Sequence, residues 1–323
     1  MLYFILKRLL YSIPLLLGIT FFTLVLIHIS PGNPLDEYRL NPQISPQTIK
    51  LYEKKFGLDK PIYIQYFLWL KNILKGDFGY SFSYKVEVKK VILSRALNTF
   101  ILSLSVIFFT WLWVIPLGVI AVLKRNKFID RILSFFSYLG VSTPTFFLAF
   151  LFLYLVTFIG WLPLGGMRSV NFEELNFWQK IIDLGKHLII PTLVLSIGNI
   201  SYLQRIMRAN LLEVLGSSYI LSAKARGLSK GRIIYIHALK NALNPMITIF
   251  GYQFSALLSG AALVEIIIGW PGLGRVILEG FQKQDLYLVM ASMFMGAILL
   301  ILGNLIADIL LAYFDPRIRY REQ

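Results

Sequence analysis

The sequence predicts an all-α polytopic membrane protein, on three observations. The chain is 57% hydrophobic and only 15% charged, whereas a soluble domain is about 45–50% apolar and about 25% charged. Its apolar residues form continuous runs as long as a membrane-spanning helix. Lys and Arg also concentrate in alternate connections between these runs. Membrane-spanning strands are not expected, because they would alternate in character over about ten residues.

Six apolar runs approach the roughly 20 residues that a helix needs to cross about 30 Å of hydrocarbon. The fourth is the weakest, because it is short and contains Asn199 and Ser201. The first is not expected to be a cleaved signal, since it exceeds a typical signal-peptide core and no small-x-small cleavage motif follows it. The predicted spans are Leu9–Ile29, Thr99–Leu123, Ile132–Ile159, His187–Gln204, Met246–Ile268 and Tyr287–Tyr313.

The positions of Lys and Arg predict the orientation of these spans. Residues 205–245 contain seven basic residues and one acidic residue, and residues 124–131 contain four and one. Residues 160–186 and 269–286 are balanced, with three of each sign and two of each sign. The two basic loops and both termini are therefore predicted to be cytoplasmic. This topology explains most of the net charge of +15 without any binding of nucleic acid.

Residues 30–98 form a long external loop by the same argument, because loops of this length cross the membrane largely regardless of charge. Helical spacing of apolar residues predicts that the loop folds. Ser45 and Pro46 are suited to begin a helix, and Gly57 is suited to end it. The subdomain is either a cap on the outer ends of the spans or a docking surface for an external partner, and both roles can hold.

The predicted domain organisation follows from these boundaries. Residues 1–29 are an N-terminal transmembrane helix, and residues 30–98 are the external subdomain. The membrane core covers residues 99–315 and includes the cytoplasmic loop 205–245, and residues 316–323 are a cytoplasmic tail.

The stretch "SSYILSAKARG" in the basic cytoplasmic loop predicts a helix–turn–helix hairpin. Tyr219, Ala223 and Arg226 have helical spacing, and Gly227 can end the helix in a left-handed conformation. Ser229 can cap a second helix that runs to Pro245. A basic amphipathic hairpin is able to lie on anionic lipid. The small residues Ala223, Ala225 and Gly227 instead favour insertion into the groove of a partner.

The hairpin resembles the cytoplasmic EAA loop of ATP-binding-cassette (ABC) importer permeases, in the form found in the dipeptide, oligopeptide and nickel branch. The matching segments are "SAKARGL" at 222–228 and "HALKNALNP" at 237–245. The acidic residue of the general EAA pattern is replaced by Leu221, and Lys240 stands where many families have proline. Further segments resemble the branch in the expected order: "SPGNP", "FGLDKPIYIQY", "GDFGYSF", "RALNTFILSL", "STPTFFLA", "EIIIGWPGLGR" and "FDPRIR".

This resemblance implies a type I importer permease with six transmembrane helices in a prokaryotic cytoplasmic (inner) membrane. It also implies a heterodimer with a homologous second permease subunit, two ATPase subunits and an extracytoplasmic substrate-binding protein. The expected cargo is di- or oligopeptides, with a nickel chelate or another small solute as the alternative. The residues expected to couple to the ATPase are Tyr219, Ala223, Lys224, Ala225, Arg226, Gly227, Leu228 and His237.

The chain lacks the residues that other function classes need. It has no G-x-x-x-x-G-K-[ST] loop to bind a nucleotide triphosphate, so ATP hydrolysis is expected in another chain. It has no cysteine, and its three histidines are scattered, so neither a metal site nor a cofactor is expected. No catalytic residue is expected either. A secondary transporter or channel remains the alternative class, but its coupling site would have to use Glu265 or Asp308, which lie near span ends.

Two further groups of residues are candidates for function within the membrane. "EIIIGWPGLGR" predicts a tight external re-entrant or gate-like turn that involves Glu265, Pro271, Gly272 and Gly274. Polar residues inside spans are candidates to line the pathway, because they gain little from facing lipid. They are Asn199, Ser201, Gln253, Ser255 and Ser259.

Overall fold

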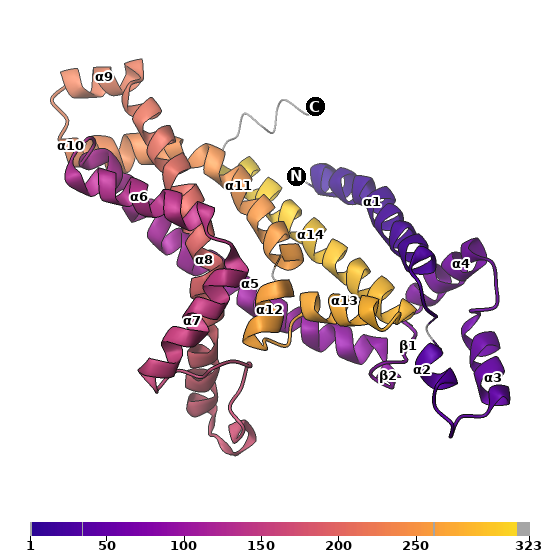
Figure 1. Ribbon diagram of the computed structural model, residues 1–323. Coiled ribbons are helices and arrows are strands. Elements are labelled where there is room, and N and C mark those ends of the chain that lie inside the picture. Colours follow the sequence, from indigo (N-terminus) through magenta and orange to yellow (C-terminus); the bar gives the residue numbers. More distant parts are fainter. Residues whose placement is uncertain (1, 34, 261, 315–323) are drawn as a thin grey trace. The chain divides into compact units, whose positions relative to one another are not determined.

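The computed structural model describes residues 2–33, 35–260 and 262–314 (Figure 1). In this part of the chain every regular element is a helix except one two-stranded hairpin, which confirms the all-α prediction. The elements are α1 (Leu2–Ile29), α2 (Asp36–Arg39), α3 (Pro46–Phe56), α4 (Ile62–Ile73), β1 (Tyr80–Ser81), β2 (Val86–Glu87), α5 (Val88–Leu123), α6 (Phe128–Ser142), α7 (Thr145–Ile159), η1 (Phe172–Glu174), α8 (Phe177–Leu215), α9 (Ser218–Ala225), α10 (Lys230–Arg232), η2 (Ile233–Ala238), α11 (Leu239–Gly260), α12 (Ala262–Ile268), α13 (Leu273–Gln282) and α14 (Leu286–Phe314).

The chain divides into two compact units. Unit 1 comprises residues 1–100, 258–262 and 271–301, and unit 2 comprises residues 101–257, 263–270 and 302–323.

Four described helices are long and apolar enough to cross a membrane. These stretches are Ile5–Ile29, Val88–Leu123, Phe177–Leu215 and Leu286–Ile306. The pair α6 and α7 forms a fifth candidate if the two helices are counted as one broken span. The chain is therefore a multi-pass membrane protein.

The predicted third span is wrong as a single helix. α6 and α7 are bent by 106° at Thr143 and Pro144, as Figure 1 also shows. Pro144 has no N–H to donate, and it forces the preceding residue out of the helical region. Thr143 accordingly has an extended backbone, with φ −89° and ψ 122°. The apolar run Ile132–Ile159 is continuous in hydropathy, so in the sequence only Pro144 indicates the break between α6 and α7.

Other predicted boundaries also differ. The fourth span is the middle of the much longer α8, which begins at Phe177 with a capping box formed by Asn176 and Gln179. The helix of the second span begins at Val88, inside the predicted external loop. The predicted fifth span divides into α11 and α12. α11 is not among the helices long and apolar enough to cross, so six spans remain a prediction.

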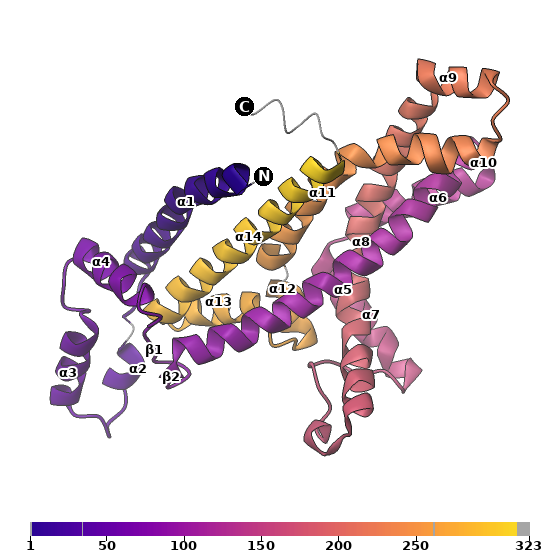
Figure 2. The same cartoon turned by 180° about the vertical axis from the view of Figure 1, so that it is seen from behind.

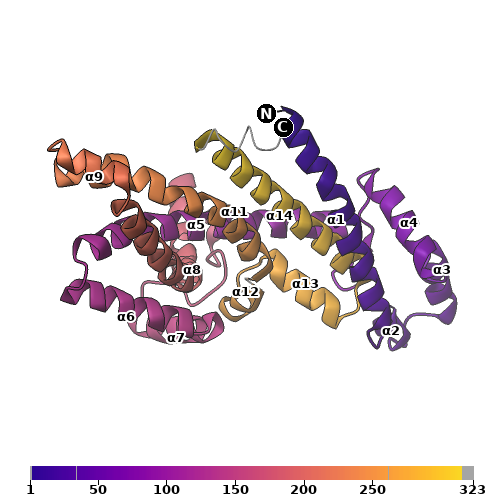
Figure 3. The same cartoon turned by 90° about the horizontal axis from the view of Figure 1, so that it is seen from above.

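In unit 1, α4 packs against α1, and Figure 3 shows the two helices side by side. The hydroxyl of Tyr66 donates to the backbone oxygen of Leu17 at 2.8 Å and shares a second hydrogen bond with Thr20 at 2.9 Å. These bonds satisfy a buried phenol inside the apolar core of the unit. The core residues are Leu24, Ile27, Tyr66, Trp69, Val88, Val91, Ile92, Leu273, Val276, Leu286, Leu288, Val289, Met290 and Ala291.

The β-hairpin of unit 1 is tied to the start of α14 by a buried carboxylate. Asp285 is fully buried and accepts hydrogen bonds from the Ser81 hydroxyl at 2.6 Å, and from the hydroxyl and backbone N–H of Ser83 at 2.6 and 2.9 Å. A buried carboxylate is tolerated only when donors of this kind replace water. The external subdomain predicted from residues 30–98 therefore folds together with part of the C-terminal region rather than alone.

In unit 2, α6 and α7 both pack against α8. The core brings together side chains from α5, α8, α9, η2 and α11, and Figure 2 shows α9 and α10 as the two arms of a hairpin. Its buried residues are Val114, Val119, Val122, Leu203, Met207, Leu211, Ile220, Ala223, Ile233, Ile234, Ala238, Ala242 and Met246.

Candidate functional site

The predicted hairpin has the expected local geometry. α9 ends at Ala225, and Gly227 adopts a left-handed backbone with φ 77°. The hydroxyl of Ser229 accepts a hydrogen bond from the N–H of Arg232 and so caps the second helix. A Cβ added at Gly227 would meet no heavy atom within 4 Å. The glycine is therefore required by its backbone conformation and not by crowding inside the chain.

The second arm of the hairpin differs from the prediction. It does not end at Pro245, because helix continues through α10, η2 and α11 to Gly260. Pro245 lies inside α11. η2 is a π-helix, a rare form that is frequent at functional sites.

The hairpin has an apolar underside and an exposed tip. Ile220 and Ala223 of α9 pack in the core with Ile233 and Ala238 of the second arm. Ala223 is buried, so it cannot meet a partner as predicted and instead holds the two arms together. The Asn241 side chain donates to the hydroxyl of Tyr219 at 2.6 Å, which adds a polar tie between the arms.

The remaining predicted coupling residues lie at or near the surface. Lys224, Ala225, Arg226 and Gly227 are exposed, and Tyr219 keeps 43% of its surface exposed. Leu228 and His237 are half-buried. The exposed tip therefore combines two cations with a small-residue turn.

A charged contact that sequence reasoning missed lies before the hairpin on α8. Arg208 donates from Nε and from one terminal nitrogen to the two carboxylate oxygens of Asp130, each at 2.8 Å. The backbone N–H of Asn126 donates to the same carboxylate at 2.9 Å. In the sequence, Asp130 stands out only as the single acidic residue of the loop 124–131. A bidentate pair of this kind fixes both distance and orientation between α6 and α8.

The predicted external turn contains buried and tightly packed residues in both units. In unit 2, Glu265 and Trp270 are fully buried, Gly269 has φ 74°, and the N–H of Gly166 donates to the oxygen of Ile268 at 2.8 Å. Glycine is therefore needed at Gly269, which the prediction did not name.

In unit 1, the start of α13 is held by α5. The Asn98 side chain donates to the oxygen of Pro271 at 2.9 Å, and the N–H of Leu273 donates to the hydroxyl of Thr99 at 2.7 Å. Gly272 is buried and has φ −95° and ψ −178°, an extended conformation, so its backbone does not require glycine and the predicted need for glycine there stays a prediction. Gly274 does need to be small, because an added Cβ would lie 2.9 Å from Cα of Ala262.

The candidate pathway residues do not form one described cluster. Buried Ser201 lies under Gly140, where an added Cβ would come within 3.0 Å of the serine Cβ. Buried Gln253 accepts from the Trp111 indole at 3.1 Å, and Asn199 donates to the oxygen of Leu195 in its own helix at 2.8 Å. These contacts favour helix packing over a shared polar surface. The side chains of Ser255 and Ser259 lie outside the described residues.

Within the described residues, no group of three or more His, Asp or Glu side chains is arranged to hold a metal ion.

Two family models together match almost the whole chain. The model described as "Binding-protein-dependent transport system inner membrane component" matches residues 114–320, and its N-terminal companion matches residues 1–105.

Relatives of known name match over nearly their full length. The chain is 37% identical to the oligopeptide transport system permease protein AppB of Bacillus subtilis, over 98% of this chain and 99% of the relative. It is 34% identical to the dipeptide transport system permease protein DppB of Escherichia coli, over all of both chains. It is 33% identical to the glutathione transport system permease protein GsiC of Salmonella choleraesuis, over 99% of this chain and all of the relative.

Proposed function

The chain belongs to the family of binding-protein-dependent transport system inner membrane components, and from this premise we propose that it is a permease subunit of an ATP-driven importer of di- and oligopeptides. The observation that carries the cargo is full-length similarity to permeases named for oligopeptides and dipeptides. None of the three relatives described above is named for nickel, so a nickel chelate is not favoured. The glutathione permease keeps a small thiol-containing peptide as a second candidate cargo.

The proposal assigns ATP hydrolysis to partner subunits and substrate delivery to an extracytoplasmic binding protein. The chain has no nucleotide-binding loop of its own. A second, homologous permease subunit completes the membrane passage. In this assignment both termini and the hairpin lie in the cytoplasm, residues 30–98 lie outside, and six spans cross the membrane. The excess of Lys and Arg in residues 205–245 supports this orientation.

The hairpin is proposed to couple the ATPase to the membrane helices. Its exposed tip, with Lys224, Arg226 and Gly227, is free to enter a groove on the ATPase subunit. Its buried underside packs on α8 and α11, so displacement of the tip has a short mechanical route into both helices. Lys224 and Arg226 would orient the contact on acidic partner residues more than they would strengthen it.

Reconstitution tests the proposed function. The chain is assembled in proteoliposomes with its second permease subunit, ATPase subunits and binding protein, and uptake of a labelled dipeptide is followed. Uptake is expected to require ATP hydrolysis and to persist when proton and sodium gradients are collapsed. Uptake that stops with the gradients but continues without ATP would assign the chain to the secondary transporters instead.

A further inference from the structure

The connection between the helices α1 and α5 contains one strongly apolar helix. α4 reads "IYIQYFLWLKNI" and carries a single charged residue, Lys71, whereas α3 carries Lys50, Glu53, Lys54 and Lys55. Its 12 residues rise only about 18 Å, so α4 is too short to cross about 30 Å of hydrocarbon. Apolar segments of about 10–14 residues are typical of buried core helices or of helices that lie in the membrane interface.

Contacts with α1 indicate how deep α4 lies. The Tyr66 hydroxyl that bonds to Leu17 and Thr20 belongs to a ring that also meets Phe21 edge-on, with the ring centroids 5.4 Å apart. α1 ends at Ile29. At 1.5 Å per residue, Leu17 and Thr20 lie about 18 and 14 Å back from that end. The Tyr66 ring is therefore placed beside the middle of α1.

The charges of α1 set the limits of its span. Lys7 and Arg8 lie near its start, and residues 9–29 carry no Lys, Arg, Asp or Glu. This uncharged run is about 31 Å long, which matches the thickness of the hydrocarbon and puts Ile29 near the membrane boundary. A tilt of about 40°, the upper end of the usual range, would reduce the depths along α1 by only about a quarter.

α14 gives a second measure of depth. The ring of Trp69 packs edge-on against Phe294, with the centroids 5.9 Å apart. The candidate span of α14 begins at Leu286, so Phe294 lies about 12 Å into it. α1, α4 and this part of α14 all belong to unit 1, so the two measures refer to one compact body. Both place the side of α4 that carries Tyr66 and Trp69 at the depth of the hydrocarbon.

α4 also has an exposed apolar stripe, formed by Tyr63, Phe67 and Leu74. Their spacing of four and seven residues puts them on one helix face, and they are 61%, 68% and 89% exposed. The stripe adjoins the exposed surface of α1. Phe21 is 42% exposed and contacts Tyr66, whose ring in turn meets that of Phe67 at 6.3 Å.

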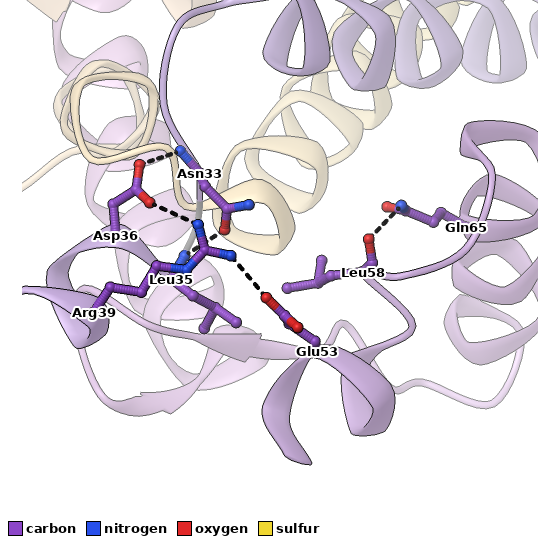
Figure 4. Close-up of polar contacts among 7 residues, drawn as sticks. All are labelled: Asn33, Leu35, Asp36, Arg39, Glu53, Leu58 and Gln65. Atoms are coloured by element: carbon purple, nitrogen blue, oxygen red, sulfur yellow. Dashed lines mark hydrogen bonds and ion pairs between the residues drawn. The ribbon is translucent and has the colours of Figure 1, made fainter. Parts of the chain in front are cut away.

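The opposite side of α4 is polar. Gln65 and Asn72 are seven residues apart and lie about half a turn from the stripe. Nε2 of Gln65 donates to the backbone oxygen of Leu58 at 3.3 Å, as Figure 4 shows, and to that of Lys60 at 2.8 Å. Asn72 is exposed. The polar side of α4 thus faces the turn that follows the charged helix α3, and the helix is amphipathic across its short axis.

We propose that α4 is an interfacial helix whose exposed stripe lies against the acyl chains of the lipid bilayer. Gln65 and Asn72 face the aqueous side, and exposed Lys71, which lies between the two sides, is placed to reach headgroup phosphates. An amphipathic helix of this kind buries its apolar face about 5–10 Å below the headgroup boundary, in agreement with the ring contacts at greater depth.

The inference goes beyond the proposed function and needs only that α1 and α14 cross the membrane. It takes one helix of residues 30–98 out of the water and anchors that subdomain in the leaflet at the Ile29 end of α1. This is the outer leaflet in the proposed orientation.

Spin labels test the surroundings of the stripe in the full chain, assembled with its partner subunits in lipid nanodiscs. The chain has no native cysteine, so Tyr63→Cys, Phe67→Cys and Leu74→Cys each carry one nitroxide. Collisions with oxygen, which concentrates in hydrocarbon, are compared with collisions with water-soluble chromium oxalate. The ratio of oxygen to chromium collisions is expected to be high at all three positions.

Three matched positions calibrate the ratio. Phe22→Cys, at a 69% exposed position of α1, should give the high ratio of a lipid-facing site. Leu51→Cys, at a 66% exposed apolar position of α3, should give the low ratio of a site in water. Asn72→Cys, on the polar side of α4, should also give a low ratio.

Two results would overturn the proposal. A ratio at the stripe as low as that of Leu51→Cys would place α4 in water. Protection of the stripe from both oxygen and chromium oxalate would mean that a protein, the second permease or the binding protein, covers it. Peptide uptake by the same reconstituted complex is measured in parallel, so loss of the lipid contact and loss of the proposed function are separate outcomes.

A second measurement does not depend on labelling. Phe67→Asp puts a carboxylate on the stripe, where contact with acyl chains would leave it poorly solvated, and should lower the melting temperature in nanodiscs. Leu51→Asp makes the same change on α3 and should lower it much less. Equal effects of the two substitutions would contradict a lipid-facing stripe.

Discussion

Arg208 and Asp130 form a bidentate ion pair in which both hydrogen bonds measure 2.8 Å. The Asp130 side chain is only 5% exposed, and that of Arg208 is 28% exposed. Removal of one partner leaves the other charge poorly solvated between α6 and α8. The pair therefore fixes the position of α6 against α8 shortly before the hairpin.

Asp130→Ala is expected to destabilise the protein by about 2 kcal/mol, since hydrogen bonds to charged groups contribute about 1.5–3 kcal/mol. The loss should appear as a lower melting temperature of the purified protein in detergent. The double variant Asp130→Ala/Arg208→Ala should melt above the value expected from adding the two single effects. Strict additivity would mean that the two residues do not stabilise each other.

Gly227→Val is expected to leave insertion and assembly with the second permease intact, but to reduce ATP-driven uptake. The left-handed conformation at φ 77° costs a non-glycine residue about 1–2 kcal/mol, and a branched side chain also enlarges the tip. Gly227→Asn should retain more uptake, because asparagine tolerates this conformation. Gly231→Val is the matched control, since Gly231 is exposed, lies in α10 and has open space around it. Equal uptake by all three variants would leave the hairpin without a coupling role.

Gly274→Ala is expected to destabilise unit 1 by about 1–3 kcal/mol, the usual cost of overpacking. The new Cβ would lie 2.9 Å from both Cα and Cβ of Ala262, so backbone must move. Gly296→Ala, in α14 of the same unit, should change the melting temperature little, because an added Cβ there would meet no heavy atom within 4 Å. A larger loss at Gly296 than at Gly274 would contradict this account of the packing.

Acid is expected to destabilise unit 1 through Glu279. Burial opposes ionisation of Glu279, but hydrogen bonds from Tyr84 and Arg275 outweigh it, so its pKa lies below the ordinary value. A carboxylate whose pKa is lowered by folding stabilises the protein above its unfolded pKa of about 4.3, and the effect is lost as pH falls through the folded pKa. Burial and the bond to Glu279 raise the pKa of Tyr84 to about 12.

The melting temperature at pH 7, 5, 4 and 3 checks this prediction. Glu279→Gln should flatten the fall between pH 5 and pH 3, while the exposed control Glu174→Gln should not. Because the raised pKa of Tyr84 keeps the phenol protonated, its contribution persists at pH 7 and disappears only as pH rises toward 12. An unchanged acid limb in Glu279→Gln would show that other carboxylates control it.

Cysteine labelling tests the orientation cleanly, because the chain contains no native cysteine. Asn72→Cys, at an exposed position in the last turn of α4, should react with a membrane-impermeant maleimide in intact cells. Lys224→Cys, at the exposed hairpin tip, should react only after the membrane is permeabilised. The reverse pattern would invert the topology.

The sequence was most informative where one residue type decides the local geometry. Ser45 caps α3, and Gly57 ends that helix at φ 67°, as predicted. Gly227 and Ser229 likewise form the predicted turn and cap. These features depend on a single backbone conformation or a single hydrogen bond, so no distant residue is needed to predict them.

Features that depend on packing could not be read in this way. Ala223 looks like a small surface residue in the sequence, but the fold of the second arm buries it. The Arg208 partner of Asp130 lies 78 residues along the chain. Hydropathy does not reveal the bend at Pro144, because the apolar run continues across it. Only the proline itself indicates the break.

The length of α8 determines how far the hairpin stands from the lipid. Within α8, residues 187–204 carry no Lys, Arg, Asp or Glu. At 1.5 Å per residue this stretch spans about 27 Å, which is close to the thickness of the hydrocarbon. Residues 205–215 therefore extend the helix about 16 Å beyond the hydrocarbon, while each headgroup layer is only about 5–8 Å deep. With residues 187–204 in the hydrocarbon and α8 along the membrane normal, we propose that α8 carries α9 beyond the headgroups. That placement would favour contact of the hairpin tip with water and with another protein over contact with headgroups.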